Sequence, residues 1–286
     1  MAQFDNRKAD KILIQEALNG KKAALNQLID RYYSKTYNIC LKMLYSHQDA
    51  EDVNQEIWIK ILTKLQTFQF KSSFKTWMYR IAVNHVLDMK KRSVELQITK
   101  GLEGYGEHLA NIKDEDLNQE EKITLKEAVI EAKLSCMSGM LMCLNREQRL
   151  IYILGDIFKI DHKMGSEIFE TSPNNYRKRL SRARKELFNF MNGQCSLVNK
   201  SNPCTCSRKT KGFIKLGYVN PDNLMFNKDY QLRIADRLLE KEEALESARL
   251  DIHTKLFQDH PFQLMPKNII EKILHEHRLD ILLRLN

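Results

Sequence analysis

The sequence has few of the residues that interrupt helices. Its 286 residues include only 10 glycines and 5 prolines, and 43% of them are hydrophobic. Collagen-like, low-complexity and disordered chains have a different composition, so these classes are excluded. Apolar residues recur at steps of three and four, which predicts an all-α protein long enough for two or three small domains.

Long apolar runs are also absent. The first residues, MAQFDNRKADKILIQEAL, lack the apolar core of a signal peptide. No later segment approaches the roughly 18 uncharged apolar residues of a membrane span. We therefore expect a cytoplasmic protein with no membrane partner, in which the six cysteines do not form disulfides.

The motifs of several common enzyme classes are missing too. The chain has no GxxxxGK phosphate loop, no HExxH pair and no GxGxxG after a strand, and His275-Glu276-His277 is too closely spaced for a zinc-protease helix. We expect no enzyme. The formal net charge of +9 favours an anionic partner, although the position of the charge matters more than its total.

Changes in composition divide the chain into four parts. We predict a helical domain over residues 1–95, a flexible acidic linker over 96–122, a second helical domain over 123–193 and a C-terminal extension over 194–286. In the first domain the helices should include one ending at Gly20, one capped by Asp49 and one running from Ser73 to Arg92. The linker combines glycines with an acidic run, so we expect it to bury little surface.

A strongly basic helix is predicted in the second domain. Ser172 is a good N-cap, Pro173 suits the first helical position, and apolar residues over 176–190 share one face. The cations beside that face are Arg177, Lys178, Arg179, Arg182, Arg184 and Lys185. A short helix over 161–169 and a break at Glu170 precede it, a pattern typical of a helix-turn-helix. A solvated cationic face on an ordinary helix is the alternative.

Four motifs in a fixed order carry a resemblance to a known family. They are DAEDVNQEIWIKI (49–61), SFKTWMYRIAVNHVLDMKKR (73–92), LNREQRLIYIL (144–154) and YRKRLSRARKEL (176–187). Together they resemble bacterial RNA polymerase sigma factors of the extracytoplasmic-function (ECF) group, over about residues 19–191. The resemblance implies a region 2 domain, a linker and a region 4 helix-turn-helix.

This resemblance implies a transcription initiation factor. Such a factor binds core RNA polymerase, at the beta-prime clamp helices and the beta flap, and directs it to promoter DNA. Region 2 would bind and melt the minus-ten element, and region 4 would bind the minus-thirty-five element. The alternative is a sigma-like adaptor or helix-turn-helix regulator that does not open promoters. Whether an anti-sigma factor is a further partner is left open.

The resemblance also assigns residues to these roles. Asp52, Gln55 and Glu56 fall where the family docks on the clamp helices, with simple solvation as the alternative. The minus-ten candidates are Ser72, Ser73, Lys75, Arg80, Asn84, Lys91 and Arg92. Polar and aromatic groups can hold unpaired bases while cations bind the backbone. Phe74 and Trp77 are expected to be core residues instead.

Region 4 should read duplex DNA through the tip of the basic helix. The minus-thirty-five candidates are Ser172, Asn174, Asn175, Arg177, Lys178, Arg179 and Arg182. The asparagines lie where a recognition helix contacts base edges, whereas most arginines should contact phosphate. Two residues depart from the family pattern: Glu170 stands where the turn usually has Gly, and Gly165 replaces a buried aliphatic residue.

The C-terminal extension contains Cys195, Cys204 and Cys206 within twelve positions. No cofactor is required by the predicted function, but these thiols could hold a structural zinc ion with a fourth ligand such as His260. A redox-responsive thiol cluster and unliganded cysteines are the alternatives. An amphipathic helix is predicted over 227–258. We expect the extension to regulate promoter access or partner binding.

Overall fold

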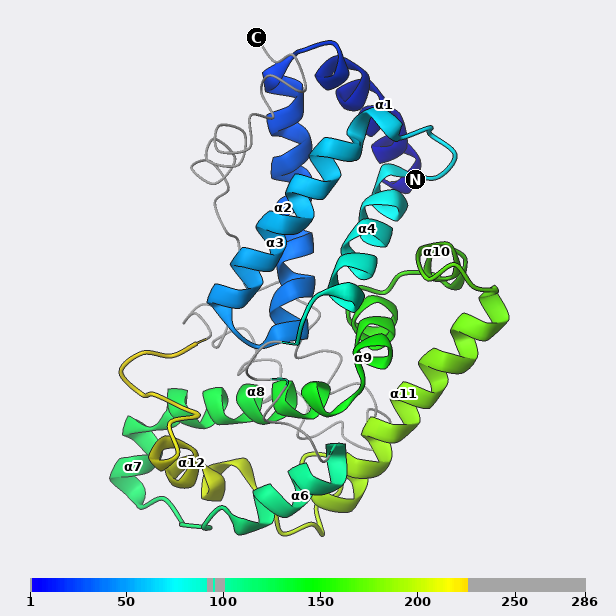
Figure 1. Cartoon of the computed structure of the whole chain (residues 1–286). Helices are drawn as coiled ribbons and strands as arrows, with labels where there is room; N and C mark the ends of the chain where they lie inside the picture. The colour runs from blue at the N-terminus through cyan, green and yellow to red at the C-terminus, as the bar shows by residue number, and fades with distance from the viewer. Residues whose placement is uncertain (1, 92–94, 96–100, 226–286) are drawn as a thin grey trace. The chain divides into compact units, whose positions relative to one another are not determined.

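The computed structural model describes residues 2–91, Glu95 and residues 101–225 (Figure 1). In this part of the chain the regular structure is helical apart from one isolated parallel β-bridge between Cys195 and Cys204, which confirms the all-α class. No helix in these ranges is long and apolar enough to cross a membrane. The predicted helix over 227–258 lies outside the described residues.

The described residues form two compact units. The first contains residues 2–91 and 160–177, and the second contains Glu95, 101–159 and 178–225. The boundary between the two units falls within α11 (Pro173–Gln194). Its residues up to Arg177 belong to the first unit, and those from Lys178 belong to the second.

The first unit is built around a long central helix. Its elements are α1 (Ala2–Leu18), α2 (Lys22–Leu44), α3 (His47–Lys64), the short 3-10 helix η1 (Leu65–Thr67), α4 (Phe74–Asp88) and α10 (His162–Ile168). Helix α2 packs along α1 and α3, and α3 packs on α4. Trp58 and Tyr33 are buried and stack in the centre, where the indole of Trp58 donates a 2.8 Å hydrogen bond to Thr36 Oγ1.

Two predicted helix boundaries in this unit were wrong. The N-cap of α3 is Ser46, whose Oγ accepts a 3.2 Å hydrogen bond from the backbone N–H of Asp49, so Asp49 lies in the first turn. Helix α4 starts after the Ser73 cap as predicted but ends at Asp88, with Lys91 beyond it and Arg92 outside the described residues. Near a cap, either Ser or Asp satisfies the free N–H groups, so the sequence left the choice open.

The predicted helix-turn-helix is present. Asp161 caps α10 by accepting a 2.8 Å hydrogen bond from the N–H of Met164. The helix ends in a left-handed residue, Glu170, at φ 49°, and the N–H of Thr171 returns to the carbonyl of Ser166 at 3.0 Å. This is the bonding of a Schellman motif, which reverses the chain before Ser172 caps α11.

The second unit joins the predicted linker, the middle of the chain and the start of the extension. Its elements are α6 (Gly101–Asn111), α7 (Gln119–Thr124), α8 (Lys126–Cys143), α9 (Arg146–Tyr152), the π-helical turn η2 (Ile153–Ile157), the rest of α11, and α12 (Cys206–Lys215). Helices α6 and α12 both pack against α8. Their shared core contains Leu109, Ile112, Ala128, Ala132, Phe213 and Val219.

The stretch that we predicted as an acidic linker therefore contains helices and contributes to a core. Its acidic residues are paired with cations of α12: Lys209 Nζ lies 3.3 Å from Asp114 Oδ1, and Lys211 Nζ lies 2.7 Å from Glu121 Oε1. Leu109 and Ile112, from the same stretch, are almost fully buried. The composition suggested disorder because the neutralising charges lie about ninety residues away in sequence.

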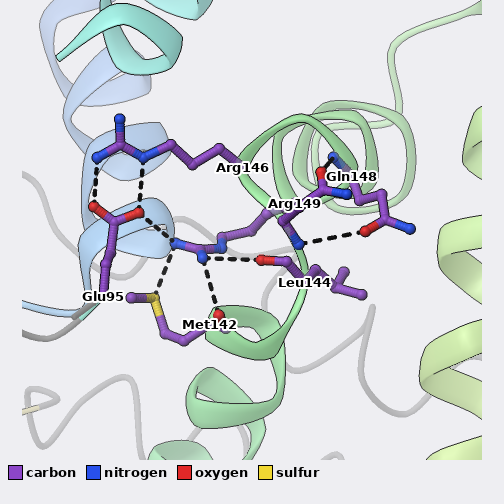
Figure 2. A network of polar contacts seen from close by, with 7 residues as sticks. Glu95, Met142, Leu144, Arg146, Gln148 and Arg149 are labelled. Atoms are coloured by element: carbon purple, nitrogen blue, oxygen red, sulfur yellow. Dashed lines mark hydrogen bonds and ion pairs between the residues drawn. The ribbon is translucent and has the colours of Figure 1, made fainter. Parts of the chain in front are cut away.

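A buried ion-pair network holds the start of α9 (Figure 2). The Glu95 carboxylate accepts two hydrogen bonds from Arg146, at 2.9 and 2.6 Å, and a longer one from Arg149 at 3.5 Å. Arg149 also donates to the carbonyls of Met142 and Leu144, both at 3.0 Å. Burial lowers the pKa of Arg149 to about 10, while Glu95 acts in the opposite direction. The guanidinium therefore stays charged at neutral pH and needs its partners.

We expect Glu95→Gln to destabilise the second unit by about 3–5 kcal/mol, because it removes the carboxylate that faces two poorly solvated guanidinium groups. Urea unfolding of the full chain measures this loss. The matched control is Glu147→Gln, since Glu147 pairs with Arg179 at a largely exposed position, where the loss should stay below about 1 kcal/mol. Equal stabilities of the two variants would contradict a structural role for Glu95.

Candidate nucleic-acid interface

Some of the predicted minus-ten residues are hydrogen-bonded within the protein, and others are exposed to solvent. Ser73 is buried, and its Oγ lies 3.0 Å from the N–H of Thr76 and 2.7 Å from Thr76 Oγ1. It is therefore the cap of α4. Ser72 is half-buried, and its hydroxyl donates to the carbonyl of Ser73 at 3.3 Å. Asn84 and Lys91 are exposed, so their polar groups can reach a ligand.

Two cations of α4, Lys75 and Arg80, are half-buried. The guanidinium of Arg80 donates to the backbone carbonyl of Glu167 through Nε at 3.1 Å and through Nη2 at 2.7 Å. Its Nη1 lies 3.6 Å from the carboxylate of Glu170. Lys75 Nζ lies over the ring of Tyr79, 5.6 Å from the ring centroid, and burial lowers the pKa of this lysine.

An aromatic cluster precedes and begins α4. Phe74 is buried as predicted, and Trp77 is half-buried, with its ring 5.7 Å from Phe74 and 5.1 Å from Phe68. Phe70 is different, because 38% of its surface is exposed and its backbone has φ 57°. We did not predict a role for this residue. The signal was an aromatic residue in the short polar segment before α4, where a core side chain is not expected.

The predicted polymerase-binding residues share the outer face of α3. Asp52 and Glu56 are exposed and Gln55 is half-buried, whereas Val53 and Ile57 point into the core with no exposed surface. The spacing of four residues thus places the three polar side chains together on the surface. Glu56 Oε2 lies 3.1 Å from Nε2 of His85 on α4, and this contact restrains the Glu56 side chain.

The tip of α11 presents polar groups to solvent. The exposed candidates are Ser172, Asn174, Asn175, Arg177, Lys178 and Arg182. The side-chain amide of Asn175 donates to Thr171 Oγ1 at 3.0 Å, and the Oγ of Ser172 caps the helix. Asn174 and Arg177 therefore have the more available side chains for contacts with bases.

Further along α11, two cations of the basic helix are engaged within the second unit. The guanidinium of Arg184 donates two hydrogen bonds to the buried carboxylate of Asp156, from Nε at 2.7 Å and from Nη2 at 2.6 Å. Arg179, a predicted DNA contact, pairs with Glu147 at a largely exposed position. Arg184 therefore stabilises the fold, and Arg179 must exchange Glu147 for phosphate if it is to bind DNA.

The packing around position 165 explains why a glycine stands there. A Cβ atom built at this position would lie only 2.4 Å from the ring of Tyr176, which is fully buried against α10. Tyr176 also contacts Phe169, with ring centroids 5.8 Å apart. The small residue in α10 and the large one in α11 thus compensate for each other in volume.

Gly165→Ala should destabilise the first unit by about 1–3 kcal/mol, because the ring of Tyr176 blocks the added methyl group. The loss should shrink when Tyr176→Leu is present, since the smaller side chain makes room. Thermal unfolding of the four proteins in this double-mutant cycle measures the effect. Gly193→Ala serves as the control, because nothing lies within 4 Å of a Cβ there; additive effects would rule out the compensation.

Among the cysteines of the extension, Cys195 is buried, and Cys204 and Cys206 are half-buried. In the part of the chain that the structure describes, no group of three or more His, Cys, Asp or Glu residues is placed to hold a metal ion. His260 lies outside the described residues, and zinc binding stays a prediction. Burial, reinforced by neighbouring thiols, raises the pKa of Cys206 to about 12 and holds that of Cys136 well above its usual value. Buried thiols of this kind are poor nucleophiles.

Comparison with known proteins supports the assignment of the first unit. Residues 28–94 match the family described as sigma-70 region 2. These residues include α3, α4 and the loop between them, which carry the candidate polymerase and minus-ten positions. The helical fold and this match define a sigma-factor region 2 domain.

Several curated proteins are similar to the chain. It is 25% identical over 182 residues to the ECF RNA polymerase sigma factor SigW of Bacillus subtilis, covering 61% of this chain and 92% of SigW. It is 32% identical over 94 residues to the RNA polymerase sigma-H factor of Pseudomonas aeruginosa, covering 32% of this chain and 49% of that one. Over 75 residues it is 39% identical to the ECF sigma-E factor of Escherichia coli, covering 26% and 39%.

One solved structure, CnrH in complex with the cytosolic domain of CnrY, aligns with a TM-score of 0.46 and 19% identity, over 64% of this chain and 97% of that one. Residues 28–94 therefore match sigma-70 region 2, and ECF RNA polymerase sigma factors are among the curated proteins to which the chain is similar.

Proposed function

We propose that this protein is an ECF sigma factor, which binds core RNA polymerase through the exposed face of α3 and directs it to promoters with two recognised elements. The observation that carries the proposal is the sigma-70 region 2 match over 28–94, together with the exposure of Asp52 and Glu56 on α3. Polar groups on a rigid, well-packed helix can dock on a partner without reorganisation. The beta-prime clamp helices are the expected partner of this face, and the beta flap that of region 4.

In this proposal the minus-ten element is melted at α4. Asn84 and Lys91 are exposed, and Phe70 offers an aromatic surface in the loop before the helix. Unpaired bases stack on aromatic side chains, and nearby cations bind the backbone. The arrangement favours promoter opening over the alternative of a regulator that binds only duplex DNA, because such a regulator has no use for a single-strand platform.

The minus-thirty-five element is read by the tip of α11. Asn174 and Arg177 are exposed in the first turns after the cap, where a recognition helix contacts base edges in the major groove. Lys178 and Arg182 are exposed cations that would contact phosphate and set the register.

The decisive experiment adds the full chain to core polymerase and sequences the transcripts that start from a genomic DNA library. We expect initiation at a defined set of sites that share two elements. Binding to such a site should weaken with salt by about 0.9 log units per log unit of salt for each neutralised phosphate. Arg182→Ala should lower that slope by about one, whereas Lys215→Ala, an exposed cation on α12, should leave it unchanged.

No specific initiation despite core binding would favour the sigma-like adaptor. Failure to bind core polymerase, with retained affinity for duplex DNA, would favour an ordinary helix-turn-helix regulator.

We also propose that the extension restrains the linker. The two promoter elements lie at separate places along one duplex, so the connection between regions 2 and 4 must reach from one to the other. A connection of about 27 residues spans roughly 90 Å when extended but only about 40 Å when helical. The contacts of Lys209 and Lys211 with the acidic residues of 96–122 favour the helical, shorter form. Opening these contacts would lengthen the connection.

Gly212→Val should therefore raise transcription from a two-element promoter. A Cβ at Gly212 would lie 2.3 Å from Cγ2 of Ile112 and 3.2 Å from the carbonyl oxygen of Lys113, so a larger side chain pushes α12 away from the linker. Reconstituted transcription with core polymerase measures the change. Gly193→Val is the matched control, because the space around Gly193 is open. Equal output from both variants and the unmodified chain would exclude this restraint.

A further inference from the structure

Helix α10 lies against α4 within the first unit, and its C-terminal end contacts Arg80, one of the predicted minus-ten cations. Arg80 donates both of its closer hydrogen bonds to the carbonyl of Glu167, at the end of α10, and lies 3.6 Å from the carboxylate of Glu170. A carbonyl oxygen and a carboxylate are the kind of anionic and polar acceptors that a DNA backbone would offer this guanidinium.

Burial and the neighbouring Lys35 lower the pKa of Lys75, whereas Asp161, the N-cap at the other end of α10, favours its charged form. Acidic residues therefore flank α10 at both ends: Asp161 is its N-cap, and Glu170, whose carboxylate lies 3.6 Å from Arg80, is in the turn after it.

The position of Glu170 is unusual for this residue type. Its φ of 49° lies in the left-handed region that glycine adopts without steric cost, and it follows the last turn of α10. Glycine would give the same turn with less strain but would carry no charge. The side chain at this position instead places a carboxylate near Arg80.

We propose that α10 and the turn after it cover the DNA-binding side of α4 in the free chain, and that minus-ten DNA displaces them. The Glu167 carbonyl, Glu170 and Asp161 then occupy the places that phosphates would take. This cover rests on the proposed role of α4 in binding single-stranded promoter DNA. An internal competitor lowers the apparent affinity of the free chain by the fraction of molecules in which α4 is uncovered.

The test compares Glu170→Gln with Glu167→Gln in the full chain. Both remove one negative charge, but only Glu170 has its carboxylate on Arg80, whereas Glu167 contacts it through the backbone carbonyl, which the substitution keeps. Because the ion pair is partly exposed, Glu170→Gln should tighten binding of a fluorescent mixed-sequence single-stranded DNA by about two- to fivefold at low salt. Glu167→Gln should change it by less than about 1.5-fold, a bound set by general electrostatics.

A second variant and a second measurement make the result independent of one substitution. Asp161→Asn keeps a good N-cap but removes the charge beside Lys75, so it should also tighten binding. Hydrogen exchange should be faster over residues 162–168 in Glu170→Gln, and in the unmodified chain it should accelerate there when the single-stranded DNA is added.

Equal DNA affinities of Glu170→Gln and Glu167→Gln, or exchange over 162–168 that DNA leaves unchanged, would overturn the cover. If the unmodified chain still supports specific initiation with core polymerase, only the cover has failed. If it does not initiate and binds no single-stranded DNA, the proposed function has failed and the cover with it.

Discussion

The second unit depends on one carboxylate, that of Glu95, placed between two guanidinium groups at the start of α9. Arg149 is almost fully buried, and a buried charge is tolerated only with a partner and satisfied hydrogen bonds. Glu95 and the carbonyls at the end of α8 provide both. The pairing ties Glu95 to α9, the helix that comes before the helix-turn-helix in the sequence.

The same requirement, that a desolvated charge find a counter-charge, recurs through the described residues. It joins Asp156 to Arg184 on α11, and Lys209 to Asp114 across the linker and extension. Each pair withdraws a cation from the surface that a positively charged chain presents to DNA. The net charge therefore says little about which side chains are available for binding; exposure and pairing decide it.

The sequence predicted the parts whose signals are local. The caps at Ser73 and Ser172, the short helix before the basic one, and the inward positions of Val53 and Ile57 follow from spacing and from hydrogen bonding within a few residues. The acidic stretch could not be predicted in the same way, because its partners on α12 are distant in sequence. Phe70 and the role of Gly165 were missed for a related reason: exposure and complementary volume appear only when segments meet.

By itself the sequence determined the helical class, the order of the sigma-like motifs and the polar tip of α11, because periodicity and capping act over one or two turns. Only the tertiary structure decided which cations remain exposed, that the linker shares a core with the extension, and that α10 packs on α4. Burial, and the pairing of charges that burial imposes, depends on contacts between residues far apart in the chain, and no local pattern records them.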